Sequence, residues 1–71
     1  MASEVRFAEV KKMLEAKGYS LTRISGSHHI FSKPGEPVLQ SIPVHNGKVK
    51  YAYVRKIEKL PDDKDNEKGG G

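Results

Sequence analysis

Glycine and proline interrupt this sequence at short intervals, and their spacing limits the elements that the chain can form. Glycine adopts backbone angles that are closed to other residues, and proline lacks the amide proton that a helix or strand needs. Such residues end one element and begin the next. The interrupting positions are Gly18, Gly26, Pro34-Gly35, Asn46-Gly47 and Pro61. The sequence therefore predicts short helices and strands joined by tight turns.

The segment before Gly18 has the pattern of an amphipathic helix. Phe7, Val10 and Leu14 recur at helical spacing, so one face of the helix is apolar and is expected to join the core. Ser3 is predicted to cap this helix, with Glu4 in its first turn, where a negative charge is favourable. Gly18 follows the last turn, at a position that suits a left-handed closing residue.

The next segments have the alternating pattern of strands, and we expect them at 19–25, 28–33 and 38–45. Thr22 and Ile24 disturb the alternation of the first strand, which predicts a bulge or an early break in its pairing. The turn at 33–37 carries proline and glycine in the order of a type II turn. Pro43 lacks an amide proton, so it predicts that the third strand lies at a sheet edge or is bulged at that point.

A second helix is predicted from Lys48 to Leu60 and ends at Pro61, with Val54 and Ile57 facing inward. The order of helix, three strands and helix predicts an α+β fold: one three-stranded antiparallel sheet with both helices on one face. We expect residues 1–61 to form one domain. Residues 62–71 contain no apolar side chain and are expected to be a disordered acidic and glycine-rich tail.

Composition excludes several kinds of stabilisation and several classes of protein. The chain has 71 residues and no cysteine, so disulfides and thiolate metal sites are excluded and the fold must be stabilised by packing. No apolar run reaches the roughly 18 residues of a membrane span, and no apolar block marks a secretory signal. A cytoplasmic protein without membrane contact is expected.

The chain has a net positive charge, which is distributed unevenly along the sequence. Residues 1–60 hold eleven lysines and arginines against five acidic residues, a net charge of +6, whereas residues 61–71 have a net charge of −2. The predicted domain is therefore more basic than the total of +4 suggests. A basic domain of this size favours a polyanionic partner such as nucleic acid.

The stretch Gly26-Ser27-His28-His29-Ile30-Phe31 carries the most reactive side chains of the chain. A free imidazole titrates at a pKa of about 6.5, so either histidine can transfer a proton near neutral pH. Side chains alternate along a strand, so one histidine faces the core side and the other faces solvent. These residues alone do not assign the working group to either histidine. Taken by themselves they favour two ordinary hairpin histidines, one packed and one solvated.

A third histidine, His45, follows a proline near a strand end, and we expect it to have a structural role. The spacing of the three histidines matches no usual ligand pattern, and adjacent strand residues point apart. We therefore predict no metal site and no cofactor.

Taken in order, several of these pieces resemble the HicA family, the toxins of bacterial and archaeal HicAB toxin–antitoxin systems. The resemblance runs from Phe7 to Leu60: a helix that ends in glycine and an aromatic residue, Arg23, the Gly26–Phe31 stretch, the proline–glycine turn and Ile42-Pro43-Val44-His45. It implies a small αβββα domain like that of double-stranded-RNA-binding proteins. It also implies a ribonuclease that cuts messenger RNA without a metal, arrests translation and is inhibited by a HicB-like antitoxin.

The resemblance assigns the essential histidine to the position after Gly-Ser, which is His28. His29 is kept as an auxiliary because some family members carry their histidine one place later, although we expect its ring to face solvent. The candidate RNA-binding residues are Arg23, Gly26, Ser27, Lys33, Lys48, Lys50, Arg55 and Lys56. Phe31, Tyr51 and Tyr53 are candidates for stacking on an unpaired base, with core packing expected for at least two of them.

A second reading of the same fold is an RNA-binding module without catalysis. Backbone contacts from lysine and arginine bind RNA without any need for paired histidines. The histidine pair therefore favours the nuclease. RNA sequence preference, the stoichiometry with an antitoxin and self-association are not predicted by these residues.

Overall fold

A computed structural model describes residues 3–62 of the chain. These residues form five strands and two helices: β1 (Glu4–Arg6), α1 (Phe7–Ala16), β2 (Ser20–Ser25), β3 (His28–Lys33), β4 (Glu36–Pro43), β5 (Lys48–Lys50) and α2 (Tyr51–Glu58). β2, β3 and β4 form an antiparallel sheet with β3 at its centre, and β1 pairs with β5 in a separate two-stranded ribbon. The predicted α+β class and the predicted three-stranded antiparallel sheet are confirmed.

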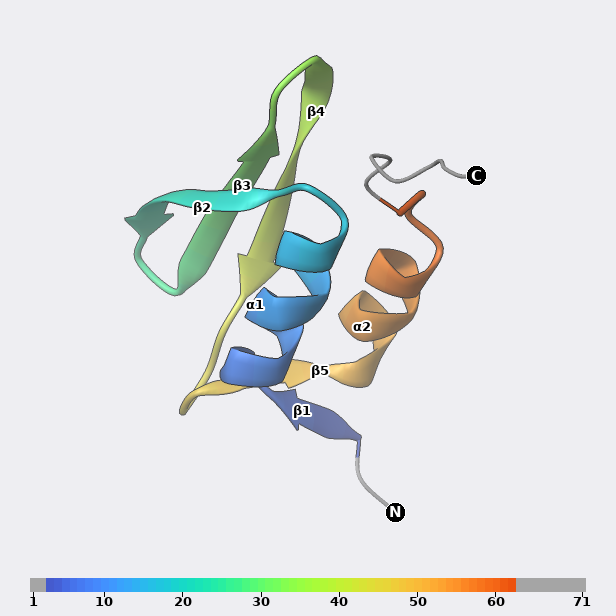
Figure 1. The fold of residues 1–71 in the computed structure, drawn as a ribbon. Helices are drawn as coiled ribbons and strands as arrows, with labels where there is room; N and C mark the ends of the chain where they lie inside the picture. Colours follow the sequence, from blue (N-terminus) through green and yellow to red (C-terminus); the bar gives the residue numbers. More distant parts are fainter. Residues whose placement is uncertain (1–2, 63–71) are drawn as a thin grey trace.

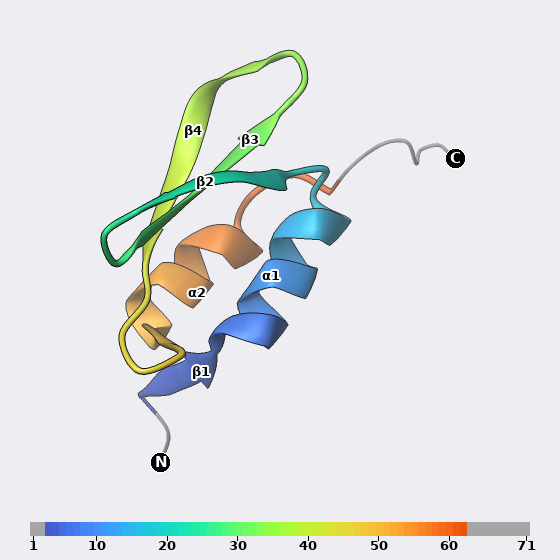
Figure 2. The same cartoon turned by 90° about the vertical axis from the view of Figure 1, so that its left-hand side faces the viewer.

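Both helices lie on one side of the three-stranded sheet (Figure 1 and Figure 2). We call the other side the open face. Its residues are assigned below from the strand register, because side chains directly opposite each other in an antiparallel pair point to the same face.

The start of the first helix differs from the prediction. Residues 4–6 form β1, and α1 begins at Phe7, with Arg6 in an extended conformation before it. Ser3 does not cap the helix, because Arg6 occupies the N-cap position, where no side chain caps the helix. The Ser3 carbonyl oxygen instead accepts a hydrogen bond from the Tyr51 amide at 2.8 Å. Pairing of β1 with β5 places the half-buried Val5 opposite Val49, next to the core. Burial of Val5 outweighs the preference of Ser3 for a capping position, because a serine cap stabilises a helix by only about 1 kcal/mol.

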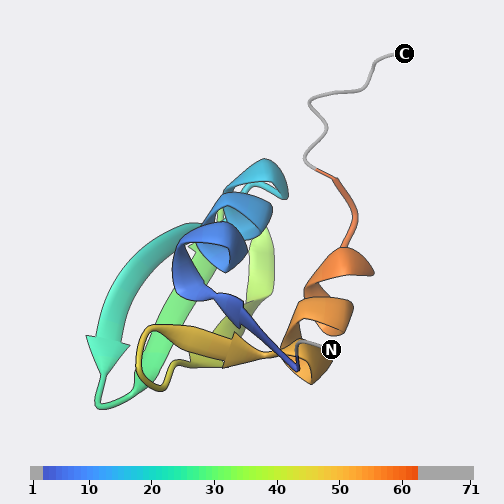
Figure 3. The same ribbon diagram turned by 90° about the horizontal axis from the view of Figure 1, so that it is seen from below.

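The predicted second helix also begins too early. Lys48–Lys50 form β5, and α2 runs from Tyr51 to Glu58. Val49 is fully buried between two exposed lysines, the alternation of a strand. Since β1 leads into α1 and β5 into α2, the ribbon lies at the N-terminal ends of both helices (Figure 3).

The sheet follows the expected turns. The β2–β3 register shifts between Leu21 and Arg23, which confirms the predicted irregularity. The third predicted strand, β4, runs from Glu36 to Pro43, so it both begins and ends two residues earlier than predicted, because its register with β3 ends at the proline. It lies at an edge of the sheet, one of the two positions expected from Pro43. Gly35 has a φ of +82°, consistent with the proline–glycine turn.

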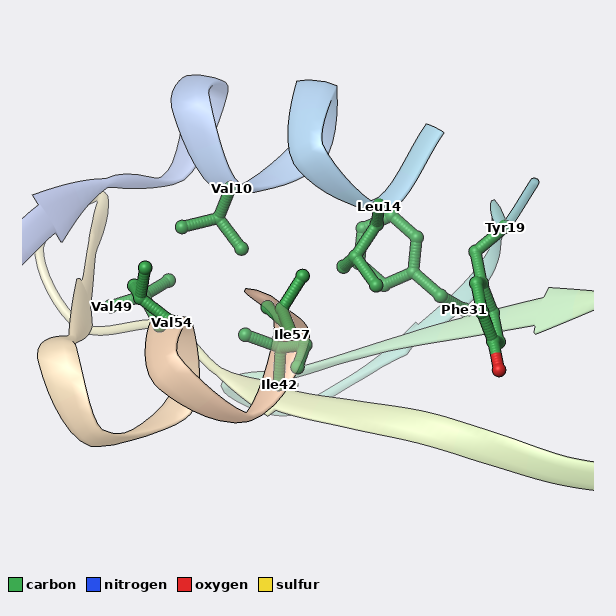
Figure 4. Close-up of a cluster of buried hydrophobic side chains, with 8 residues drawn as sticks. All are labelled: Val10, Leu14, Tyr19, Phe31, Ile42, Val49, Val54 and Ile57. Carbon is green, nitrogen blue, oxygen red and sulfur yellow. The ribbon is translucent and has the colours of Figure 1, made fainter. Parts of the chain in front are cut away.

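The core lies between the helices and the sheet. Val10 and Leu14 of α1 meet Val54 and Ile57 of α2 above the sheet, as the helical periodicity predicts (Figure 4). Phe31 at the centre of the sheet is fully buried. Among residues 3–62, the buried apolar residues are Val10, Leu14, Tyr19, Phe31, Ile42, Val49, Val54 and Ile57. Each contributes about 1.5–3 kcal/mol when it leaves water, so this small cluster stabilises the domain without a disulfide.

The C-terminal ends of the two helices are joined by a charged contact. The Lys17 ammonium lies 2.8 Å from Oδ1 of Asp62 and 3.5 Å from the Glu58 carbonyl oxygen, to which it also donates. Asp62 therefore contacts the domain, although the sequence assigns it to the tail. The rest of that tail, residues 63–71, lies outside the described residues. Neither described helix is long and apolar enough to span a membrane.

Candidate active site

A tight turn between β2 and β3 places His28. Ser25 and His28 form the last pair of the two strands, and Gly26 between them has a φ of +61°. This left-handed angle is readily adopted by glycine and strained for a residue with a Cβ. The glycine–serine pair therefore returns the chain at once, so that the imidazole follows directly after the turn as the first side chain of β3.

The two adjacent histidines have different environments. His28 is exposed, whereas His29 is half-buried and its ring lies 4.5 Å from the ring of Phe7 on α1. His29 shares the helix-covered face with Phe31, and His28 shares the open face with Ile30. The prediction that the His29 ring faces solvent is therefore wrong. The exposure of His28 leaves its ring accessible to a ligand.

His29 has an unusual polar environment for a half-buried ring. Its Nδ1 atom is buried and has no hydrogen-bond partner among the described residues. A buried nitrogen without a partner costs about 1–3 kcal/mol, so this ring is retained at some expense to stability. The ring packs between the sheet and α1 and faces away from the side where His28 lies.

The strand register defines the neighbours of His28 on the open face. Ser25 of β2 and Pro43 of β4 lie directly opposite it on either side. Arg23 and Ser41 lie opposite Ile30, one step further along the same face. Diagonal neighbours of this kind have Cα atoms about 7–8 Å apart, a distance that the long Arg23 side chain spans easily. An anion beside His28 is thus within reach of a guanidinium.

The structure brings together only some of the predicted RNA-binding residues. Gly26, Ser27 and Arg23 adjoin His28, and Lys48 and Lys50 are exposed on β5, which follows β4 in the chain. Arg55 and Lys56 are exposed on α2. Lys33 lies at the far end of β3, with its ammonium 5.8 Å from the centre of the Tyr19 ring, so it does not join the His28 neighbourhood.

A shallow pocket of about 200 Å³ lies where β4, β5 and α2 meet, and it is lined by Pro43, His45, Lys50 and Tyr53. Lys50 is predicted from the sequence as an RNA contact and Tyr53 as a stacking residue, but neither is grouped there with Pro43 or His45. The signal that the sequence offers is the spacing of Pro43, the last residue of β4, and His45, two residues after it. Phe31, the stacking candidate in the sheet, is fully buried and belongs to the core.

No group of three histidine, cysteine, aspartate or glutamate side chains within residues 3–62 is arranged to hold a metal ion. The side chains around His28 and the pocket carry imidazole, guanidinium, ammonium and hydroxyl groups. These groups can transfer protons and bind anions.

The chain matches a family of known proteins. A family model described as "HicA toxin of bacterial toxin-antitoxin" matches residues 7–60. Searches of curated proteins and of solved structures each returned no match. The implied likeness to double-stranded-RNA-binding domains therefore stays a prediction.

Proposed function

Because this chain belongs to the HicA toxin family, we propose that it is an endoribonuclease that cleaves messenger RNA without a metal, with His28 as a proton-transfer group. The observation that carries the proposal is the position of His28: exposed on the open face, directly after the Gly26-Ser27 turn and within reach of Arg23. The match that shows the family covers both this turn and the pocket.

Ribose makes such a reaction accessible without a metal, because RNA carries its own nucleophile. A base removes the proton of the 2′-hydroxyl, the 2′-oxygen forms a bond to phosphorus, and the bond from phosphorus to the 5′-oxygen breaks. An acid then protonates the departing 5′-oxygen, which leaves a 2′,3′-cyclic phosphate and a free 5′-hydroxyl. An imidazole suits either proton transfer near neutral pH, and each such transfer typically accelerates a reaction by about 10²- to 10⁴-fold.

The phosphate needs positive charge beside it while negative charge builds on its oxygens. Arg23 supplies a guanidinium on the same face as His28. Arginine binds phosphate oxygens through two parallel hydrogen bonds, which fixes their orientation as well as their charge. We assign Arg23 this role, with Gly26 and Ser27 shaping the approach to His28.

Membership of a toxin–antitoxin family implies an antitoxin partner. We propose that this partner is an acidic, HicB-like protein that covers the open face and blocks RNA from His28. The net charge of +6 on residues 1–60 favours such a partner, because complementary charge speeds and orients association.

The test is RNA cleavage by the purified chain in the presence of a metal chelator. We expect the wild-type chain to cleave, and we expect His28→Ala to lose at least about 10²-fold in rate while its circular dichroism and melting temperature stay unchanged. Because His28 is exposed, its removal should not disturb packing. A wild-type chain that binds RNA tightly and leaves it intact would instead identify a non-catalytic RNA-binding module.

A further inference from the structure

The pocket lined by Pro43, His45, Lys50 and Tyr53 has no role in the chemistry described so far. Its volume of about 200 Å³ is below the roughly 300–1,000 Å³ of sites that enclose a drug-sized ligand. It is suited to a single group such as a phosphate or a ribose, with the remainder of the ligand outside. The residues that line it carry an imidazole, an ammonium and a phenol, a set that binds an anion.

This pocket shares Pro43 with the neighbourhood of His28. Pro43 forms one wall of the pocket and also lies directly opposite His28 in the sheet. The pairing continues one residue beyond the end of β4, since the Val44 amide donates to the Ser27 carbonyl oxygen at 2.7 Å. Strand alternation then turns Val44 toward the core, where it packs, and leaves His45 on the same side as Pro43 and His28.

His45 is the diagonal neighbour of His28 in this arrangement. Diagonal neighbours on one face have Cα atoms roughly 7–8 Å apart. A phosphate group between two such rings has each imidazole within hydrogen-bonding reach of a different oxygen. In-line cleavage of RNA requires this arrangement, because the attacking 2′-oxygen and the departing 5′-oxygen lie on opposite sides of the phosphorus.

Two hydrogen bonds fix the backbone of His45, one through its amide and one through its carbonyl oxygen. Its amide donates to the Lys48 carbonyl oxygen at 2.9 Å, and the Lys48 amide donates back to the His45 carbonyl oxygen at 2.9 Å. Asn46 and Gly47 between them have φ angles of 54° and 73°, as a tight two-residue hairpin turn requires. A side chain that leaves a fixed turn is positioned more precisely than one on a loose loop.

The charges around the pocket are suited to a phosphodiester. Lys50 lines the pocket, and the Lys56 ammonium lies 5.6 Å from the centre of the Tyr53 ring. Buried or half-buried structural histidines are usually held by packing or by hydrogen bonds, as His29 is held by Phe7. His45 is exposed, which argues against the structural role expected from the sequence.

We propose that His45 is the second proton-transfer group of the ribonuclease, and that the pocket holds the scissile phosphate against it through Lys50 and Tyr53. This inference rests on the proposed function. One of the two imidazoles takes the 2′-hydroxyl proton and the other, as an imidazolium, gives a proton to the 5′-oxygen, so the pair ends the step with its protonation states exchanged. No further reactant is required.

The test compares two substrates of identical sequence. One is ordinary RNA, and in the other a sulfur atom replaces the bridging 5′-oxygen at the cleavage position. A thiolate leaves without help from an acid, because thiols are far stronger acids than alcohols. The chains are the wild type, His28→Ala, His45→Ala and His45→Gln, with Lys12→Ala on the outer side of α1 as the control.

We expect His45→Ala to lose about 10²- to 10⁴-fold in kcat on ordinary RNA, with little change in KM. On the sulfur substrate, the cleavage rate of the variant that lacks the acid should recover to within about tenfold of the wild-type rate. The cleavage rate of the variant that lacks the base should not recover. Lys12→Ala should match the wild type on both. His45→Gln keeps the size of the side chain and repeats the test should His45→Ala fold poorly.

Two results would overturn the inference. If His28→Ala is inactive on ordinary RNA while both His45 variants stay within about threefold of wild type, His45 takes no part and the proposed function stands. If the His45 variants lose the same factor on both substrates and neither histidine variant is rescued, His45 serves only to position the RNA. A wild-type chain that cleaves neither substrate contradicts the nuclease itself.

Discussion

At the scale of single residues, the site depends on which of two adjacent histidines faces which way. His28 is exposed on the open face, and His29 packs against Phe7 on the helix-covered face of the sheet. Alternation predicts that the two rings point apart, but it assigns neither to a face. Ile30 and Phe31 follow them, so each face carries one large apolar residue as well as one histidine. The larger one, Phe31, is in phase with His29, and this signal was available in the sequence.

The environment of His29 leads to the first prediction. Replacing His29 by leucine removes the buried Nδ1 atom that lacks a partner and keeps an apolar side chain of similar size against Phe7. We expect the free energy of unfolding either to increase or, if it decreases, to do so by less than about 1 kcal/mol. RNA cleavage should be retained, because the ring faces away from the open face. Urea denaturation and a cleavage assay measure the two effects.

The matched control for His29→Leu is the same change at the neighbouring position. His28→Leu should leave urea denaturation unaltered and abolish cleavage, which is the reverse of the expected pattern for His29. A folded His29→Leu chain that no longer cleaves RNA would transfer the proton-transfer role from His28 to His29.

At the scale of elements, longer segments are predictable from the sequence and the ribbon is not. Val10 and Leu14, and likewise Val54 and Ile57, recur at helical spacing and are buried as the pattern predicts. β1 and β5 have three residues each, too few to establish a period of two. Val49 also stands four residues before Tyr53 and eight before Ile57, so it fits the apolar stripe of a helix equally well.

The ribbon also depends on contacts between distant parts of the chain. Val5 pairs with Val49, and Phe7 donates its amide proton to the Gly47 carbonyl oxygen at 2.8 Å. No local pattern of residues reports such a pairing. The pocket is hidden for the same reason, because the segment predicted as helix from Lys48 contains the strand that brings Lys50 beside His45. A helix starting at Lys48 would have removed the turn that holds His45.

The contact between the ends of the two helices leads to the second prediction. The Lys17 ammonium, through its hydrogen bond and its charge, lowers the pKa of the Asp62 carboxyl below the ordinary value of 3.8. A carboxyl whose pKa is lower in the folded chain stabilises that fold above its unfolded pKa, and this contribution is lost as the pH falls through the folded pKa. The stabilisation should therefore be complete at pH 6 and decline below about pH 4.

Thermal unfolding at pH 6 and at pH 3 measures this contribution. The difference in melting temperature between the two pH values should be smaller for Asp62→Asn than for the wild type. Glu36→Gln, at the exposed start of β4, is the control, and it should retain the wild-type difference. Identical pH dependence in the wild type and in Asp62→Asn would show that the ion pair makes no contribution in solution, as is common for exposed pairs.

At the scale of the whole molecule, both helices cover one face of the sheet, and the other face remains free to bind a ligand. Both helices pack on the same side of the sheet, and the core lies between them and Phe31 and Ile42 (Figure 4). The open face presents His28 and Arg23, and the pocket with Lys50 adjoins it through Pro43. A domain of this size has little surface to divide between functions. The proposed function therefore predicts that RNA and an antitoxin compete for the same side.

This arrangement leads to the third prediction, which concerns salt. A protein that neutralises phosphates releases counterions, so the logarithm of its affinity for single-stranded RNA falls linearly with the logarithm of salt concentration, with a slope of about −0.7 per phosphate. Using the His28→Ala chain to prevent cleavage, we expect Lys50→Ala to reduce the magnitude of this slope by about 0.7. Lys12→Ala, which removes the same charge from the outer side of α1, should leave the slope unchanged. Fluorescence anisotropy of a labelled RNA at several salt concentrations measures both. If the two lysine variants reduce the slope equally, the RNA is held by the net charge of the domain as a whole, and the open face and its pocket have no privileged role in binding.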